Sequence, residues 1–100
     1  MTILVSYDIE NDRLRLKTAN KLLEYGLMRL QKSVFSGSVA ETPWKHLHQW
    51  LEKEVVTNFQ PEDRLLYLPL TEGQASLFKF LPAPPPEWGE VIDSPNTLFL

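Results

Sequence analysis

The chain of 100 residues contains no cysteine and only two histidines. Without cysteine, neither a disulfide framework nor a cysteine-based zinc site can exist. His46 and His48 are two positions apart on a predicted helix, so they point to different faces and do not chelate one ion. The chain also has no glycine-rich phosphate loop and no Ser-His-Asp arrangement.

Long apolar runs are also missing. None approaches the ~20 residues that a membrane-spanning helix requires. The N-terminus lacks the basic region, apolar segment and cleavage site of an export signal. With 43% hydrophobic and 23% charged residues, the composition is that of an ordinary globular domain. We therefore expect a cytoplasmic protein with no membrane partner. Its core should be modest, so a dimer that buries more area is expected.

The net charge of −3 argues mildly against a general nucleic-acid binder. Its distribution is uneven. Residues 1–32 carry six basic and four acidic side chains, whereas residues 33–100 carry four basic and nine acidic ones. The basic cluster in the first third is interpreted either as a solvated helix face or as a surface that contacts phosphates.

Periodicity predicts the main elements along the chain. A strand over 2–9 is followed by a helix over 12–25, with Asn11 or Asp12 as N-cap and Gly26 as its left-handed end. This helix is predicted to bury Leu16, Ala19 and Leu23. Residues 27–40 alternate as strand, with a bend near Gly37 that divides the segment.

The second half is predicted in the same way. Thr42 is the predicted N-cap of a helix over 43–58, which buries Trp44, Leu47, Leu51 and Val55. Strands follow over 64–70 and 76–81. The prolines of 82–86 form a stiff connection to an apolar end over 97–100. Such an end is expected to add to the sheet edge of a partner subunit.

This order predicts an α+β, ferredoxin-like βαββαβ fold, with two helices on one face of an antiparallel sheet. The ferredoxin-like domain is expected over 1–81. Residues 82–100 are expected to be a linker and a C-terminal strand that is exchanged in a homodimer. The fold alone does not decide the function.

Asp8 is the first candidate for chemistry. It stands at the end of the apolar run Val5-Ser6-Tyr7-Asp8-Ile9, where a rigid strand positions a carboxylate that still reaches solvent. Such a position suits a metal ligand or a catalytic group, and a helix cap is the alternative.

These residues carry a family resemblance. Tyr-Asp-Ile at 7–9, Tyr-Gly at 25–26 and Arg-x-Gln-x-Ser-Val-Phe at 29–35 resemble the CRISPR-associated protein 2 family, the small proteins of CRISPR spacer acquisition. The resemblance is specific over 1–40 and looser beyond. The sequence departs from the family pattern at Lys32, where the family commonly has an aromatic residue, and at Ser36, where it often has an acidic one.

The resemblance implies a ferredoxin-like homodimer in which two copies of Asp8 face each other across the two-fold axis. Family members are described as metal-dependent nucleases that act on RNA or duplex DNA. Others are described as bridges between dimers of the CRISPR-associated protein 1 integrase. Two carboxylates and a substrate phosphate would make a credible magnesium site.

Other positions carry over one at a time. Arg15 and Lys17 match basic positions of the first helix that could contact phosphates, with a solvated helix face as the alternative. Arg29 would bind phosphate or hold the Asp8 region by an ion pair. Tyr7, Ser33 and Phe35 match supporting positions, for which strand packing is the alternative interpretation.

Three functional hypotheses remain at this point. The chain is a spacer that bridges integrase dimers and DNA, or a Mg²⁺-dependent phosphodiesterase that uses paired Asp8. The third hypothesis is a ferredoxin-like regulatory dimer that binds a small ligand and has no nuclease activity.

Overall fold

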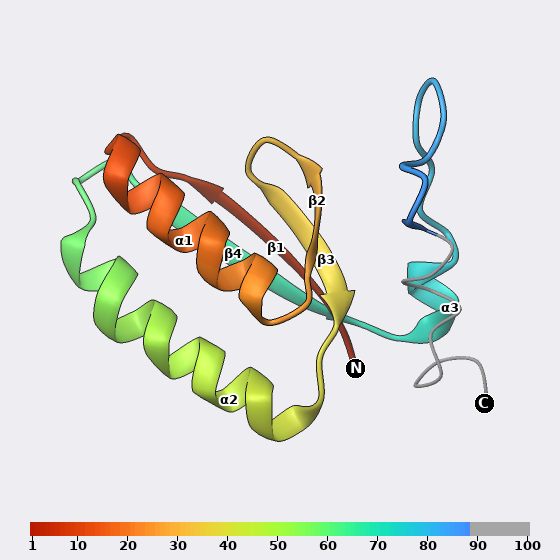
Figure 1. The fold of residues 1–100 in the computed structure, drawn as a ribbon, viewed down its shortest axis with the longest axis horizontal. Helices are drawn as coiled ribbons and strands as arrows, with labels where there is room; N and C mark the ends of the chain where they lie inside the picture. The colour runs from red at the N-terminus through yellow and green to blue at the C-terminus, as the bar shows by residue number, and fades with distance from the viewer. Residues whose placement is uncertain (89–100) are drawn as a thin grey trace.

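The computed structural model describes residues 1–88 and consists of an antiparallel sheet with two long helices on one side (Figure 1). The predicted strand over 97–100 lies outside the described residues. The elements are β1 (Thr2–Asp8), α1 (Asp12–Glu24), β2 (Met28–Gln31), β3 (Val34–Ser38), α2 (Glu41–Trp50), β4 (Arg64–Leu70) and α3 (Glu72–Ala75).

The four strands are ordered β2-β3-β1-β4, and every neighbouring pair is antiparallel. β1 is therefore an inner strand, paired with β3 from Thr2 to Ser6 and with β4 from Thr2 to Asp8. This order, with two helices packed on one face, is the predicted ferredoxin-like α+β fold.

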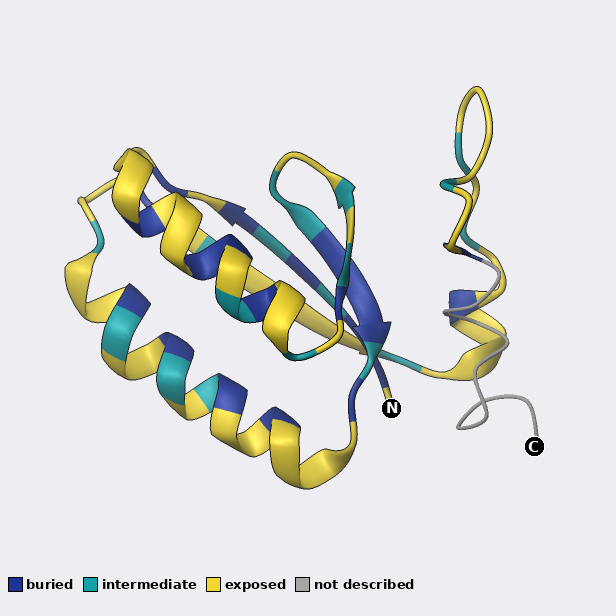
Figure 2. Cartoon of the chain, viewed as in Figure 1, coloured by how far each residue is buried: buried dark blue, intermediate teal, exposed yellow. Residues whose placement is uncertain are grey.

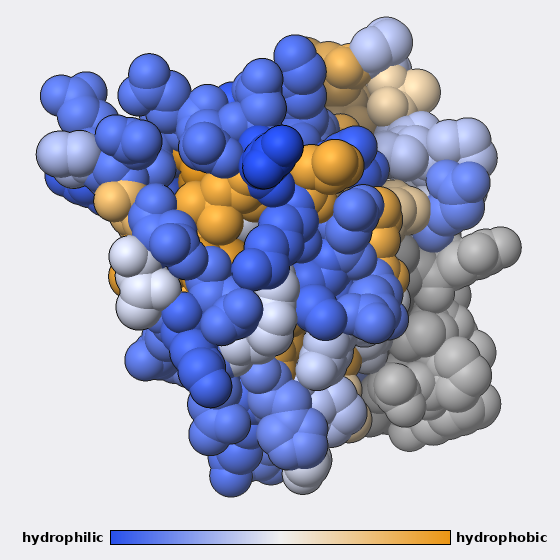
Figure 3. Space-filling model, turned by 60° about the vertical axis from the view of Figure 1, so that its left-hand side comes forward, coloured by the Kyte–Doolittle hydropathy of each residue, from blue (hydrophilic) through white to orange (hydrophobic). Residues whose placement is uncertain are grey.

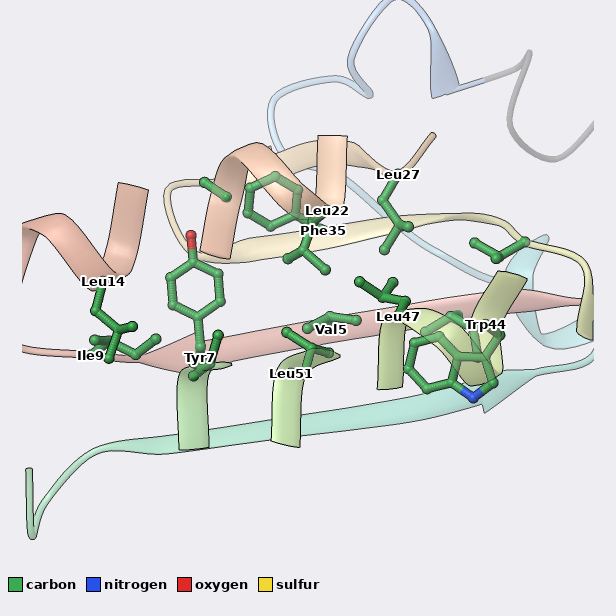
Figure 4. Close-up of a cluster of buried hydrophobic side chains, with 14 residues drawn as sticks. Val5, Tyr7, Ile9, Leu14, Leu22, Leu27, Phe35, Trp44, Leu47 and Leu51 are labelled. Carbon is green, nitrogen blue, oxygen red and sulfur yellow. The ribbon is translucent and has the colours of Figure 1, made fainter. Parts of the chain in front are cut away.

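Alternation along β1 divides the sheet into two faces. Ile3, Val5 and Tyr7 are at most 5% exposed. Figure 4 shows Val5 and Tyr7 within the buried cluster between the sheet and the helices. Their partners on this face include Phe35 of β3, which is fully buried. The residues between them point to the opposite face, which we call the open face. There β4 leaves Leu66 59% and Leu68 49% exposed.

Helix α1 begins as predicted, because the Asn11 side chain accepts a hydrogen bond of 2.9 Å from the Leu14 backbone N–H. The prediction of its buried face was correct at Ala19 and wrong at Leu16 and Leu23. The structure buries Leu14, Thr18, Ala19 and Leu22, and leaves Leu16 61% and Leu23 46% exposed. Figure 2 shows buried positions that recur along α1 between exposed ones. Thr18 can be buried on this face because its hydroxyl donates a hydrogen bond to the Leu14 carbonyl.

Gly26 ends α1 with a φ of 90°, as predicted. The segment after it was divided wrongly at Gly37. The turn lies at residues 32–33, and Gly37 is an interior residue of β3. Glycine is required there for space, because an added Cβ would lie 2.8 Å from the Leu27 Cα and 2.9 Å from the Gly26 carbonyl oxygen.

The second helical segment covers 41–58, because α2 continues through a π turn at Leu51–Val55 and a 3₁₀ turn at Val56–Asn58. It buries the four predicted residues. The predicted cap was wrong, since Ala40 is the N-cap and has no side-chain bond. Nowhere in residues 1–88 does a helix have the length and apolar content needed to cross a membrane.

The predicted strand over 76–81 is absent from the described residues. The short helix α3 precedes this segment and is closed by a capping box between Thr71 and Gln74. Phe78 and Phe80 instead pack on Trp88, at ring-centroid distances of 4.9 and 5.2 Å. The alternation of these aromatics therefore reflects a local cluster, not a paired strand.

We predict that Gly37→Ala destabilises the fold by about 1–3 kcal/mol, because the new methyl group meets rigid backbone on two sides. Urea denaturation measures the change. Gly73→Ala is the matched control, since its Cβ would find no atom closer than 4.0 Å. Equal losses in both variants would contradict the close-packing explanation for Gly37.

Candidate functional site

A depression of about 500 Å³ lies at the end of β1, between the start of α1 and the β2–β3 hairpin. Five of the seven site residues predicted from the sequence line it, together with four others. The lining residues are Tyr7, Asp8, Ile9, Asp12, Arg15, Leu16, Arg29, Lys32 and Ser33. Figure 3 turns this end of the molecule forward, and hydrophilic side chains cover most of the face that it shows.

Asp8 is the last residue of β1 and is exposed. It shares the open face with Leu4 and Ser6, because strand residues two apart point the same way. Within residues 1–88 its carboxylate forms no hydrogen bond or ion pair. It does not cap α1, since Asn11 does so. The carboxylate is therefore available to a ligand.

Arg15 was predicted as a phosphate contact, and the structure gives its guanidinium a different set of partners. Nη1 donates to the carbonyls of Ile9 and Glu10, both at 2.9 Å, and Nη2 pairs with the carboxylate of Asp12. These bonds hold the connection that directly follows Asp8. Because its side chain is also 44% exposed, Arg15 can still present charge to the depression.

Tyr7, Phe35 and Arg29 form a stack at one wall of the depression. The Tyr7 and Phe35 rings lie 6.0 Å apart at an interplanar angle of 22° (Figure 4). The Arg29 guanidinium carbon lies 5.0 Å from the Phe35 ring centroid, a cation–π arrangement. Phe35 is buried beneath the site, so its place here is that of a support for the other two side chains.

Lys17 lies outside the depression, on the side of α1 that faces α2. Its ammonium is 3.3 Å from a carboxylate oxygen of Glu54 and 5.7 Å from the Trp50 ring centroid. Lys21 lies over the same ring, and its hydrogen bond to Glu24 raises the pKa of the Lys21 ammonium. The two lysines thus lie on a separate surface, where each is paired with a glutamate carboxylate.

Sequence reasoning missed Asp63, a carboxylate that is only 5% exposed. One oxygen accepts from the Glu10 backbone N–H at 3.0 Å, and the other accepts from the Gln60 N–H at 2.8 Å. Asp63 therefore ties the connection after Asp8 to the turn before β4. The signal was present in the antiparallel pairing of residues 2–8 with 64–70, which brings these two connections together.

The described residues contain no group of three or more His, Cys, Asp or Glu side chains that could hold a metal ion. Asp8 and Asp12 line one depression, but Asp12 is paired with Arg15. Residues 1–88 of one copy therefore do not supply a complete magnesium site. The carboxylate of Asp8 fits such a site only if a second carboxylate or a substrate phosphate joins it.

Comparison with known proteins identifies the relatives of this chain. Residues 1–76 match the family model described as "CRISPR associated protein Cas2". A "CRISPR-associated endoribonuclease Cas2" of Korarchaeum cryptofilum is 36% identical over 72 residues, which cover 72% of this chain and 74% of that protein. A similarly named protein of Chloroflexus aurantiacus is 42% identical over 55 residues, or 55% of this chain and 65% of its own length.

Solved structures show the same fold. A hypothetical protein from Thermus thermophilus superimposes with a TM-score of 0.67 at 28% identity, over 84% of this chain and 93% of its own. Cas2 of Streptococcus pyogenes superimposes with a TM-score of 0.68 at 22% identity, over 81% of this chain and 99% of its own.

We predict that Asp63→Asn lowers the free energy of unfolding by about 1–3 kcal/mol, because an amide cannot accept both backbone hydrogen bonds. The Glu10 amide should exchange its hydrogen faster than in the unmodified protein, as NMR can measure. Glu62→Gln, at an exposed neighbouring position, is the control and should change stability by less than about 0.5 kcal/mol. An unchanged hydrogen-exchange rate of the Glu10 amide would refute the proposed hydrogen bond between this amide and the Asp63 carboxylate.

Proposed function

The chain belongs to the CRISPR associated protein Cas2 family, and from this premise we propose that it acts on nucleic acid as a homodimer in CRISPR spacer acquisition. The observation that carries the proposal is the exposed, unpaired carboxylate of Asp8 beside three cationic side chains, Arg15, Arg29 and Lys32. In such an arrangement the carboxylate can bind a metal ion, and the cationic side chains can bind the phosphodiester of a substrate.

The open face of the sheet supports a homodimer. Leu66 and Leu68 project from β4 with more than 45% of their surface exposed, and Leu4 lies opposite Leu68 on β1. Contiguous apolar surface of this kind favours association. A second copy packed on this face in an isologous arrangement would bring its own Asp8 toward the first, because Asp8 lies on the same face.

The paired carboxylates would hold Mg²⁺ together with a substrate phosphate. A bound magnesium ion would lower the pKa of a coordinated water and neutralise charge on the phosphate. The chain's own residues then do the positioning. Arg29 and Lys32 hold the phosphate backbone, and the Arg15 clamp keeps Asp8 at the edge of the depression. The relatives named as endoribonucleases favour RNA among the possible substrates.

The same dimer would also act as a bridge between integrase dimers. In this role it holds DNA through the cationic surfaces of α1, including Lys17, and sets the distance between two copies of the CRISPR-associated protein 1 integrase. The acidic balance of residues 33–100 fits a protein that shares the DNA with a partner. The bridge and the nuclease use different features, so one substitution separates them.

We predict that Asp8→Asn reduces Mg²⁺-dependent cleavage of labelled RNA or duplex DNA by about 100-fold or more, because the neutral amide is a poor ligand for a hard cation. Gel-based cleavage assays across a series of Mg²⁺ concentrations measure the loss. Glu10→Gln is the control, since that acid is exposed and does not line the depression.

Two outcomes of this experiment decide between the roles. If cleavage by the Asp8→Asn protein equals that of the unmodified protein, the catalytic role of Asp8 is wrong. If spacer acquisition in cells survives the substitution while cleavage is lost, the bridge does not require the chemistry of Asp8.

We predict that Leu68→Lys weakens the dimer by about thirtyfold, because it places a charge in the apolar open face. Sedimentation equilibrium measures the dissociation constant. Val56→Lys is the matched control, as Val56 is 44% exposed on the helical layer and should leave the dimer intact. Similar effects of the two substitutions would place the dimer interface elsewhere.

A further inference from the structure

Arg64 stands at the position of β4 directly opposite Asp8 in the β1–β4 pairing. Residues opposite each other in antiparallel strands point to the same face, with Cβ atoms about 4.5–5.5 Å apart. The register therefore places the Arg64 side chain across from Asp8, on the open face. Sequence motifs did not single it out, because its place depends on strand register.

The expected ion pair between these two side chains is not formed. Nη1 of Arg64 donates instead to the carbonyls of Pro61 and Asp63, at 2.9 and 2.7 Å. No ion pair of Arg64 exists among residues 1–88, and neither Nε nor Nη2 has a partner there. The guanidinium is thus held by one nitrogen, while two others can donate to a ligand.

The turn that holds Arg64 is itself closed by hydrogen bonds. The Asp63 N–H donates to the Gln60 carbonyl at 3.0 Å, and the Asp63 side chain accepts from the Gln60 N–H. Asp63 also accepts from Glu10, two residues after Asp8. Arg64 and Asp8 are therefore fixed to one rigid unit, which reduces the entropic cost of binding a ligand between them.

Arg64 and the hairpin cation Arg29 lie on different faces of the sheet. Arg29 pairs with Phe35, and Phe35 pairs with Val5, so Arg29 is on the helix side. Arg64 pairs with Asp8 and is therefore on the open face. Arg64 thus offers its free donors to a ligand of Asp8 on the face opposite to Arg29.

We propose that Arg64 is a phosphate-binding residue of the Asp8 site, and that it holds the nucleic-acid backbone on the open face, directly across from the Asp8 carboxylate. The guanidinium suits this role because its planar fork matches phosphate oxygens. The proposal rests on the proposed function and adds a substrate contact on the side of Asp8 away from the hairpin.

The test measures binding of fluorescein-labelled RNA and duplex DNA by anisotropy, over a series of KCl concentrations without divalent metal. Arg64→Gln should weaken binding by about tenfold, the value expected for one charged hydrogen bond. The slope of log affinity against log salt should fall by about one, because one phosphate contact is lost. Lys53→Gln removes an equal charge from an exposed helical position and should change neither quantity.

The outcomes separate this proposal from the proposed function. If the unmodified protein binds neither probe, the proposed function fails. If it binds and Arg64→Gln binds with equal affinity and slope, only the role of Arg64 is overturned. If Arg64→Gln does not fold, the Arg64→Lys variant tests the proposal instead. It keeps the positive charge, so we expect an unchanged salt slope and a reduced affinity. Full affinity in the lysine variant would then refute a contact through the guanidinium fork.

Discussion

β1 pairs with β3 on one side and with β4 on the other, and its alternation gives each of its residues one of two environments. Odd positions from Ile3 to Tyr7 enter the core beneath the helices. Even positions, ending at Asp8, point to the open face. A shift of one residue in either pairing would place Asp8 in the core, where an unpaired carboxylate is costly. The apolar packing of β1 therefore decides where the acid lies.

The connection after β1 is held by hydrogen bonds that fix the backbone beside Asp8. Asn11 caps α1, Arg15 binds the carbonyls of residues 9 and 10, and Asp63 accepts from the Glu10 N–H. These bonds come from three parts of the chain and leave the backbone beside Asp8 little freedom. A carboxylate without partners on such a rigid support is preorganised for a ligand.

Within residues 1–88, Asp8 is the one acid of the depression without a partner, and this limits what one copy does. Magnesium usually binds through one or two carboxylates and substrate phosphates, and keeps several waters. The position of Asp8 on the apolar open face therefore matters, because a copy that packed on this face would bring a second Asp8 close to the first. The surface that favours association is also the surface on which a second carboxylate would arrive.

Local patterns were sufficient for the first strand, the bodies of the two long helices and the strand over 64–70. Alternation, the Asn11 cap and Gly26 determine the first strand and helix, because these signals act within a few residues. They failed where packing prevails. The hairpin turns at residues 32–33, and Gly37 lies inside β3, where the backbone of Gly26 and Leu27 leaves no room for a Cβ.

The sequence by itself determined that Asp8 ends a buried strand and that Tyr7, Arg29 and Phe35 accompany it. Only the tertiary structure decided which cations share its surroundings. Lys17, close to Asp8 in sequence, lies with Glu54 on the far side of α1, whereas Arg64, distant in sequence, lies directly opposite. The physical reason is that helical rotation and strand register place charges in space, and both depend on which apolar side chains pack in the core.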